Sequence, residues 1–110
     1  MVPYEMSLKL HGEMTIYRAT ELKDTLWQAL QQATDALVTD LSEITEIDIA
    51  GIQILMLIQQ TAPRMHKTVQ WLHPSPVVMN ALQALNLNAF FGKALLSDDR
   101  ADKEGAGHGI

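Results

Sequence analysis

Residues 40–51, DLSEITEIDIAG, and the apolar residues on either side of them decide how this chain folds. Residues 36–41 are short, mostly apolar and bounded by polar residues, which is typical of a buried strand. Residues 50–61 are apolar on almost every side, and their length and the stop at Pro63 favour a helix. We therefore expect a connection over 44–48 that leads from the strand into a helix capped by Asp48.

The residues before this stretch indicate a strand followed by a helix. Residues 5–10 alternate weakly between polar and apolar, as a half-buried strand does. A break is expected at residues 11–12, and residues 14–17 extend the strand or turn back as a second, short one. Residues 20–33 carry leucines on one face and charged residues on the other, which predicts an amphipathic helix with Thr20 as its N-cap.

The residues after it continue the alternation of strand and helix. Residues 67–73 predict a strand, and Ser75 with Pro76 predicts the start of a helix. The inner face of that helix is expected to consist of Val78, Ala81, Leu82 and Leu85. Residues 1–96 are thus expected to form one α/β domain, and the polar, glycine-rich residues 97–110 a disordered tail.

The composition excludes several classes of function. The chain has 110 residues, of which 47% are hydrophobic, enough for a single packed core. It contains no cysteine, which excludes disulfides, thiolate metal sites and cysteine nucleophiles. The net charge is −5, the wrong sign for a nucleic-acid binder or for attachment to an anionic membrane surface. Acidic residues without any basic one occur at Asp40, Glu43, Glu46 and Asp48.

No segment predicts insertion into a membrane or export. The N-terminus lacks a charged region followed by an apolar one, so no signal peptide is expected. The most apolar run, residues 49–58, is about ten residues long, whereas a membrane-spanning helix needs about 20. We therefore expect a cytoplasmic protein.

No pattern of residues predicts catalysis, a metal site or a cofactor. The acidic residues 40–48 lack the glycine and the regular oxygen spacing of a calcium loop. The chain has no glycine-rich phosphate loop and no local signature of a nucleophile with its base. The histidines show no metal-ligand spacing; they are His11, His66, His73 and His108.

Gly51 is unusual because it lies in the first turn of the predicted helix. A glycine there costs about 1 kcal/mol relative to alanine. The cost suggests that another backbone approaches closely, either from this chain or from a partner. The free N–H groups and positive dipole of a helix N-terminus make it a natural place to recognise charge.

The pattern D-L-S-x-[VI]-x-x-[IV]-D-x-[SA]-G-[LI]-x-x-L, here residues 40–55, resembles the core motif of STAS domains. These are the anti-sigma-factor antagonists and their relatives in transporters and signalling proteins. Residues 11–13, 75–78 and 85–91 are also similar to family motifs, so the resemblance covers roughly residues 5–92. It implies a small STAS-like fold, with helices packed on a central mixed β-sheet.

The resemblance also identifies a modification site that this chain lacks. In antagonists of the partner-switching type, the serine before the glycine is phosphorylated, and that position is Ala50 here. In a second version of the motif the hydroxyl follows the aspartate, at the position of Ile49. Neither side chain can accept a phosphoryl group, which implies a state fixed as unmodified and competent to bind. Ser42 and Thr45 are the possible substitute sites.

The resemblance implies a non-catalytic module for protein interaction in bacterial signalling or regulation. The implied partner is an anti-sigma-type kinase, a chemotaxis component or another regulatory protein, and a homodimer stays open. The implied binding residues are Ile44, Thr45, Glu46, Asp48, Ile49, Ala50, Gly51 and Gln53. Some stand-alone STAS proteins stabilise an ABC-type ATPase, so the alternative is an accessory subunit of a phospholipid transport complex. A third alternative is an enzyme or nucleotide-binding domain.

Overall fold

Strands and helices alternate along residues 5–96, the part of the chain that the computed structural model describes. The strands are β1 (Glu5–Met14), β2 (Ala36–Ile47), β3 (Thr68–Leu72) and β4 (Leu95–Leu96). The helices are α1 (Ala19–Gln32), α2 (Ile49–Thr61), α3 (Pro76–Ala84) and α4 (Asn88–Phe91). Short 3-10 turns occupy Ile16–Arg18, Ala62–Met65 and Gly92–Ala94.

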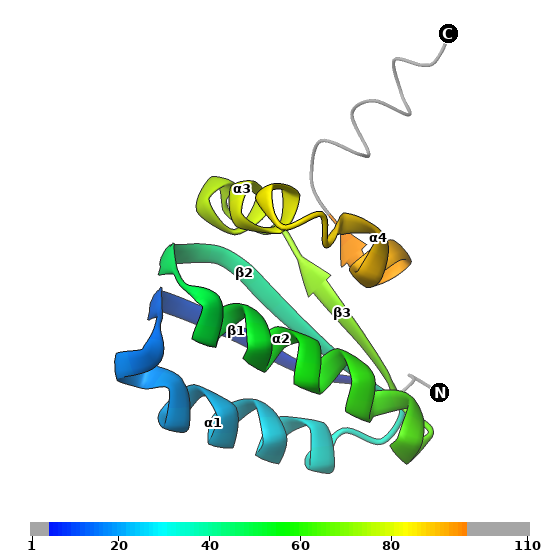
Figure 1. The fold of residues 1–110 in the computed structure, drawn as a ribbon. Coiled ribbons are helices and arrows are strands. Elements are labelled where there is room, and N and C mark those ends of the chain that lie inside the picture. The colour runs from blue at the N-terminus through cyan, green and yellow to red at the C-terminus, as the bar shows by residue number, and fades with distance from the viewer. Residues whose placement is uncertain (1–4, 97–110) are drawn as a thin grey trace, which may run out of the picture.

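The described strands form one sheet in the order β1-β2-β3-β4. Helices α1 and α2 lie side by side over one face of it, and α3 lies beyond the end of β3 (Figure 1). The α/β class is confirmed. The expected mixed sheet is wrong for residues 5–96, because every pairing there is parallel. The physical reason is that helices separate successive strands, and each crossover returns the chain in the same direction.

β1 runs straight through the break that the sequence predicts at residues 11–12. Gly12 adopts a positive φ of 85° at a shift in the register between β1 and β2, and the pairing resumes beyond it. The guanidinium of Arg18 donates to the carbonyl oxygens of His11 and Glu13, at 2.8 and 2.9 Å, and so braces the irregularity. The second short strand expected at residues 14–17 is wrong, because β1 ends at Met14 and a 3-10 turn follows.

β2 is longer than the predicted strand and absorbs most of the predicted connection at 44–48. It continues to Ile47 because β1 pairs with it again after each of two register shifts, as far as the pair Met14 and Ile47. Ile44 is buried within this extension. The chain therefore turns from β2 directly into α2, with Asp48 as the one residue between them.

The structure confirms only some of the helix caps that the sequence predicts. Asp48 caps α2 as predicted, with its carboxylate accepting the N–H of Gly51. The cap predicted at Thr20 is wrong, because α1 already starts at Ala19 and no side chain caps it. Ser75 precedes α3 as predicted, but its hydroxyl makes no capping bond. At the far end of α1, the Lys67 ammonium donates to the carbonyl oxygens of the helix's last turn.

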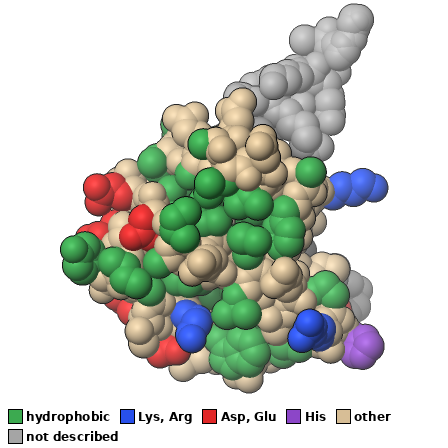
Figure 2. Space-filling view, viewed as in Figure 1, with side chains coloured by type: hydrophobic (Ala, Val, Ile, Leu, Met, Phe, Trp, Pro, Cys, Tyr) green, Lys and Arg blue, Asp and Glu red, His purple; other side chains and the backbone are tan. Residues whose placement is uncertain are grey.

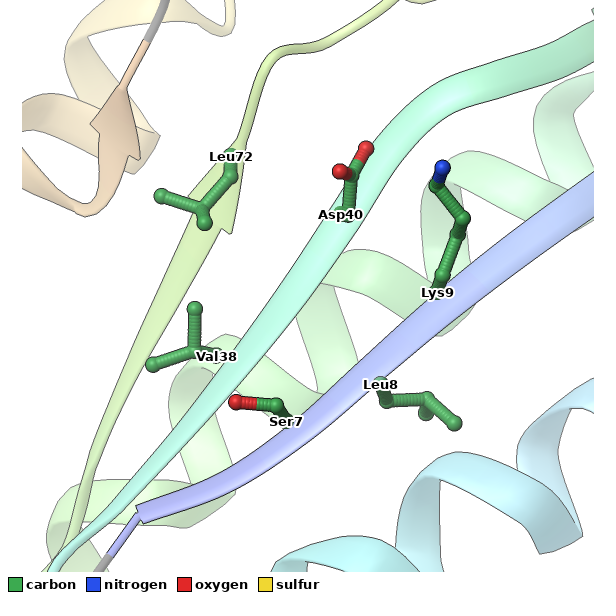
Figure 3. Close-up of a pocket in the computed structure, with 6 residues that line it drawn as sticks. All are labelled: Ser7, Leu8, Lys9, Val38, Asp40 and Leu72. Atoms are coloured by element: carbon green, nitrogen blue, oxygen red, sulfur yellow. The ribbon is translucent and has the colours of Figure 1, made fainter.

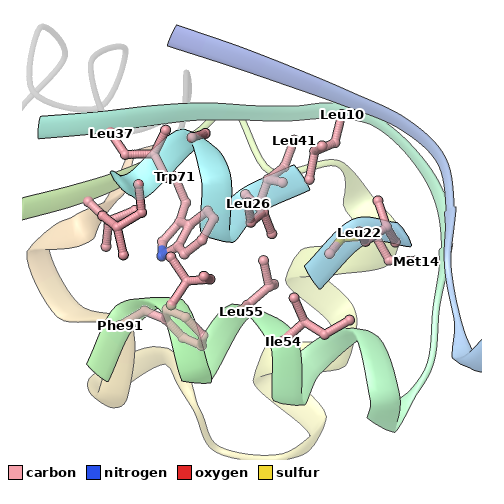
Figure 4. Packing of buried hydrophobic residues seen from close by; sticks show 14 of the residues in the cluster. Leu10, Met14, Leu22, Leu26, Leu37, Leu41, Ile54, Leu55, Trp71 and Phe91 are labelled. Atoms are coloured by element: carbon pink, nitrogen blue, oxygen red, sulfur yellow. The ribbon is translucent and has the colours of Figure 1, made fainter. Parts of the chain in front are cut away.

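The core lies between the sheet and the helices, and leucine is its most frequent residue (Figure 4). Trp71 is fully buried, donates its indole N–H to Gln59 Oε1 at 2.9 Å, and meets the ring of Phe91 edge-on at 6.4 Å. Val78 and Leu82 form the buried stripe of α3. Leu85 was predicted to join them, but the helix ends before it and its side chain is exposed. The tail predicted at residues 97–110 lies outside the described residues.

Candidate functional site

The start of α2 is held against the turn that follows β1 by a single carboxylate. Asp48 Oδ1 accepts the N–H of Gly51 at 3.1 Å, and Oδ2 accepts the N–H of Ile16 at 3.0 Å. The N–H of Asp48 donates to the carbonyl oxygen of Met14 at 3.2 Å. The N–H groups of Ile16 and Gly51 stabilise the charged form and hold the pKa of Asp48 below its ordinary value.

Gly51 completes this junction by having no side chain. A Cβ atom at this position would collide with the carbonyl oxygen of Met14 and would lie 2.9 Å from Ile47 Cγ1. The backbone that approaches Gly51 closely therefore comes from this chain, which resolves the two alternatives that the sequence left open. Gly51 itself is buried.

Three large apolar side chains are exposed around the junction, and we call them the apolar cluster. They are Ile16, Tyr17 and Ile49, whose exposed fractions are 62%, 88% and 56%. Figure 2 shows hydrophobic side chains that protrude at the left edge of the molecule, beside acidic ones. Ile16 and Tyr17 were not predicted as surface residues of the site, because residues 14–17 were expected to continue the strand or form a second one. The usable signal was the apolar pair at residues 16–17, which two residues separate from the motif at residues 11–13.

Carboxylates border the apolar cluster. Glu13 and Glu46 are neighbours across β1 and β2, one residue before the last pair of that ladder, which joins Met14 to Ile47. Glu46 is exposed, and Glu13 is half-buried and accepts the Thr15 hydroxyl. With Asp48 they make an acidic rim, so this surface is complementary to a partner with apolar and basic side chains.

The structure separates the predicted binding residues into accessible and inaccessible ones. The accessible ones are exposed or half-buried: Thr45, Glu46, Asp48, Ile49, Ala50 and Gln53. Ile44 and Gly51 are buried, so neither can contact a partner directly. Ile44 is buried because its side chain belongs to the hydrophobic core, and Gly51 because the backbone of Met14 packs against it.

The two substitute phosphorylation sites are both accessible. Ser42 and Thr45 are exposed residues of β2. The backbone N–H of Ser42 donates to Asp40 Oδ1 at 2.8 Å, which places a carboxylate close to this residue. A phosphate on Ser42 would therefore face electrostatic repulsion from Asp40.

The sheet face opposite α1 and α2 holds a shallow pocket of about 360 Å³ (Figure 3). Its lining residues are Ser7, Leu8, Lys9, Val38, Asp40 and Leu72. Burial raises the pKa of Asp40. Hydrogen bonds from Ser42 and the nearby charges of Lys9 and His73 lower it by more, so the pKa lies below its ordinary value. Lys9 also pairs with Glu43 at 3.3 Å. The pocket thus combines a carboxylate and an ammonium over an apolar floor.

Residues 5–96 contain no group of three or more histidine, aspartate or glutamate side chains placed to hold a metal ion. Among the helices of this same part of the chain, none has the length and apolar character needed to cross a membrane.

A protein family and several solved structures are similar to this chain. A family model described as "Mlab, STAS domain" matches residues 2–97. The anti-sigma factor antagonist SpoIIAA, in its unphosphorylated form, is 16% identical with a TM-score of 0.66, over 100% of this chain and 96% of that one. Phosphorylated SpoIIAA, from Bacillus, is 15% identical with a TM-score of 0.62, over 96% and 95%.

A transport-related protein also has this fold. It is a sulfate transporter family protein from Wolinella succinogenes, 17% identical with a TM-score of 0.71, over 92% of this chain and 84% of that one. At these identities the solved structures show a common fold. No curated protein matches the sequence.

Proposed function

The chain belongs to the STAS domain family, and on that premise we propose that it is a non-catalytic module that binds a protein partner at the start of α2. The observation that carries the proposal is the apolar cluster, which stands exposed beside the α2 N-terminus and is fixed there by Asp48. Fully burying an exposed isoleucine side chain is worth about 1.5–3 kcal/mol, and an interface could still cover the 56% of Ile49 that is exposed. The acidic rim selects for a partner with basic residues around an apolar patch.

The proposed module cannot be phosphorylated at the positions that are modified in switchable relatives. Ile49 and Ala50 occupy the positions that carry a hydroxyl in switchable relatives, and neither can accept a phosphoryl group. Binding at this surface is therefore constitutive unless another residue is modified. Ser42 and Thr45 are the hydroxyls that could replace the missing one, and the carboxylate beside Ser42 disfavours a second negative charge there.

The partner that we propose is a cytoplasmic regulatory protein of bacteria, such as an anti-sigma-type kinase or a chemotaxis component. The second candidate function is that of an accessory subunit in an ABC-type transport complex. Two observations favour it: the family model that covers residues 2–97 bears the Mlab description, and the exposed apolar cluster suits permanent attachment to a larger subunit. A homodimer through the same surface is a further possible outcome.

The decisive test is a quantitative pull-down with the variant Ile49→Asp. Aspartate in the first turn of α2 suits the helix dipole, so the variant is expected to fold. The substitution removes one of the three apolar side chains of the apolar cluster. We expect at least tenfold weaker recovery of the partner. Leu85→Asp is the matched control, because it changes an exposed leucine near the end of α3 in the same way.

Circular dichroism checks that both variants are folded. Recovery of the partner at the wild-type level by folded Ile49→Asp would contradict the proposal. The identity of the recovered protein, an ATPase or a kinase-like regulator, separates the two candidate functions. Peptide mass mapping of the recovered chain tests the fixed state, which a phosphate on Ser42 or Thr45 would overturn.

A further inference from the structure

A second apolar surface lies on the same helical layer, away from the apolar cluster. A groove of about 470 Å³ runs between α1 and α2, and Trp27 and Leu57 line it with exposed fractions of 38% and 41%. Leu57 follows Ile49 by two turns of α2, which is about 12 Å along the helix axis. The groove is therefore separate from the surface of the proposed function.

Two cations at the rim of the groove have no ion-pair partner among residues 5–96. Lys23 and Arg64 line it, and within residues 5–96 neither forms an ion pair. Two other cations of this layer do have partners, because Lys67 caps α1 and Arg18 pairs with Glu21. Figure 2 shows a hydrophobic patch at the lower edge, flanked by Lys or Arg side chains on both sides. Asp24 also lines the groove and leaves it with a net charge of +1.

The walls of the groove determine the conformation of what can fill it. Both are helices whose backbone groups are bonded within the helix, so neither wall offers a free strand edge. An extended segment would find no partners for its backbone there, whereas a helix satisfies its own. Laying the apolar face of an amphipathic helix into such a groove is a common mode of recognition.

We propose that the α1–α2 groove is the docking site of an amphipathic helix from a partner protein. This helix places apolar side chains on Trp27 and Leu57 and carboxylates beside Lys23 and Arg64. The charge of the groove selects an acidic helix, while the acidic rim at the other end of the layer selects basic residues. A partner that engages both ends would be fixed in one orientation along α2.

The experiment uses the full chain and a synthetic helical peptide that lacks tryptophan. The probe carries two leucines one turn apart on one face, flanked by glutamates, and a second peptide replaces these glutamates with lysines. Trp27 is the reporter, because the other tryptophan, Trp71, is fully buried. We expect the acidic peptide to protect the fluorescence from quenching by acrylamide, and the basic peptide not to. The variant Trp27→Phe should lose the signal.

Charge variants of the chain test the rim. Arg64→Glu is expected to weaken binding of the acidic peptide about fivefold or more, because it replaces an attraction with a repulsion. Lys93→Glu is the matched control, since it makes the same change at an exposed residue outside the groove. Ile49→Asp should leave peptide binding intact, so this proposal and the proposed function can fail independently.

Three results would overturn the proposal. The first is no protection of Trp27 by the acidic peptide at millimolar concentration. The second is equal loss of binding in Arg64→Glu and Lys93→Glu, which would indicate general charge attraction. The third is protection of Trp27 that grows with protein concentration in the absence of peptide, which would assign the groove to a second copy of this chain.

Discussion

Gly51 lies in the first turn of α2, where its missing side chain leaves room for the carbonyl group of Met14. Two effects of opposite sign meet at this residue. Helix propensity favours alanine over glycine by about 1 kcal/mol. A Cβ at this position would collide with the carbonyl oxygen of Met14 and with Ile47, and would push α2 away from the ends of β1 and β2. Such overpacking costs about 1–3 kcal/mol.

The variant Gly51→Ala tests which effect dominates. We expect a net loss of about 1–2 kcal/mol in the free energy of unfolding, because the atom that Cβ meets belongs to the backbone and cannot rotate away. Urea denaturation measures the change. Gln53→Ala, at an exposed position of the same helix, is the control and should change stability by less than about 0.5 kcal/mol. A stabilised Gly51→Ala would show that the approach of Met14 is not tight.

At the scale of elements, Asp48 ties the turn before α1 to the first turn of α2. Its two carboxylate oxygens accept N–H groups from the turn before α1 and from the first turn of α2. The apolar cluster is contributed by these same two segments, Ile16 and Tyr17 by the turn and Ile49 by the helix. The carboxylate therefore determines the shape of the surface that we propose for the partner.

The lowered pKa of Asp48 makes the stability of this junction depend on pH. The stabilisation by the charged carboxylate is present above its ordinary pKa of 3.8 and is lost as the pH falls through the lower pKa of the folded state. Asp48→Asn should therefore be less stable than the wild type at pH 7, and the difference should shrink below about pH 3.8.

Urea midpoints of both proteins between pH 7 and pH 3 measure this effect. Asp24→Asn is the control, because Asp24 is exposed and accepts no hydrogen bond within residues 5–96. A gap between wild type and Asp48→Asn that stays constant over this range would mean that the charge of the carboxylate plays no part.

At the scale of the whole molecule, the buried side chain of Trp71 connects α2 with α4. Its indole N–H bonds to Gln59 of α2, and its ring meets Phe91 of α4. Helix α2, which contributes to both proposed binding surfaces, is therefore linked to α4 through one buried side chain. This predicts that they unfold together.

Phe91→Ala tests this cooperativity. Removing a fully buried phenylalanine costs about 3–5 kcal/mol, and we expect the whole of residues 5–96 to lose that stability. Unfolding followed by circular dichroism and by tryptophan fluorescence should give the same midpoint. Phe90→Ala, at the half-buried neighbour, is the control and should cost less. In the Trp27→Phe background, where Trp71 is the remaining tryptophan, loss of fluorescence at a lower urea concentration than loss of helix would indicate two separate units.

The sequence by itself determined the features that depend on neighbouring residues. The apolar face of residues 20–33 and the apolar run of 50–61 predicted α1 and α2, and Asp48 predicted the cap between strand and helix. The motif at 40–55 resembled the STAS family, and it also showed that Ile49 and Ala50 lack a hydroxyl. Period, capping and motif are local properties, so they can be recognised without the fold.

Only the tertiary structure decided the features that depend on contacts between distant residues. β1 passes Gly12 and β2 passes Ile44 because each strand supplies the other's hydrogen-bonding partners, which no local pattern reveals. The same pairing buries Ile44 and ends β1 at Met14, and so leaves Ile16 and Tyr17 exposed beside α2. The accessible surface of the site is thus set by long-range pairing, because packing between distant segments determines which of its apolar side chains remain in contact with water.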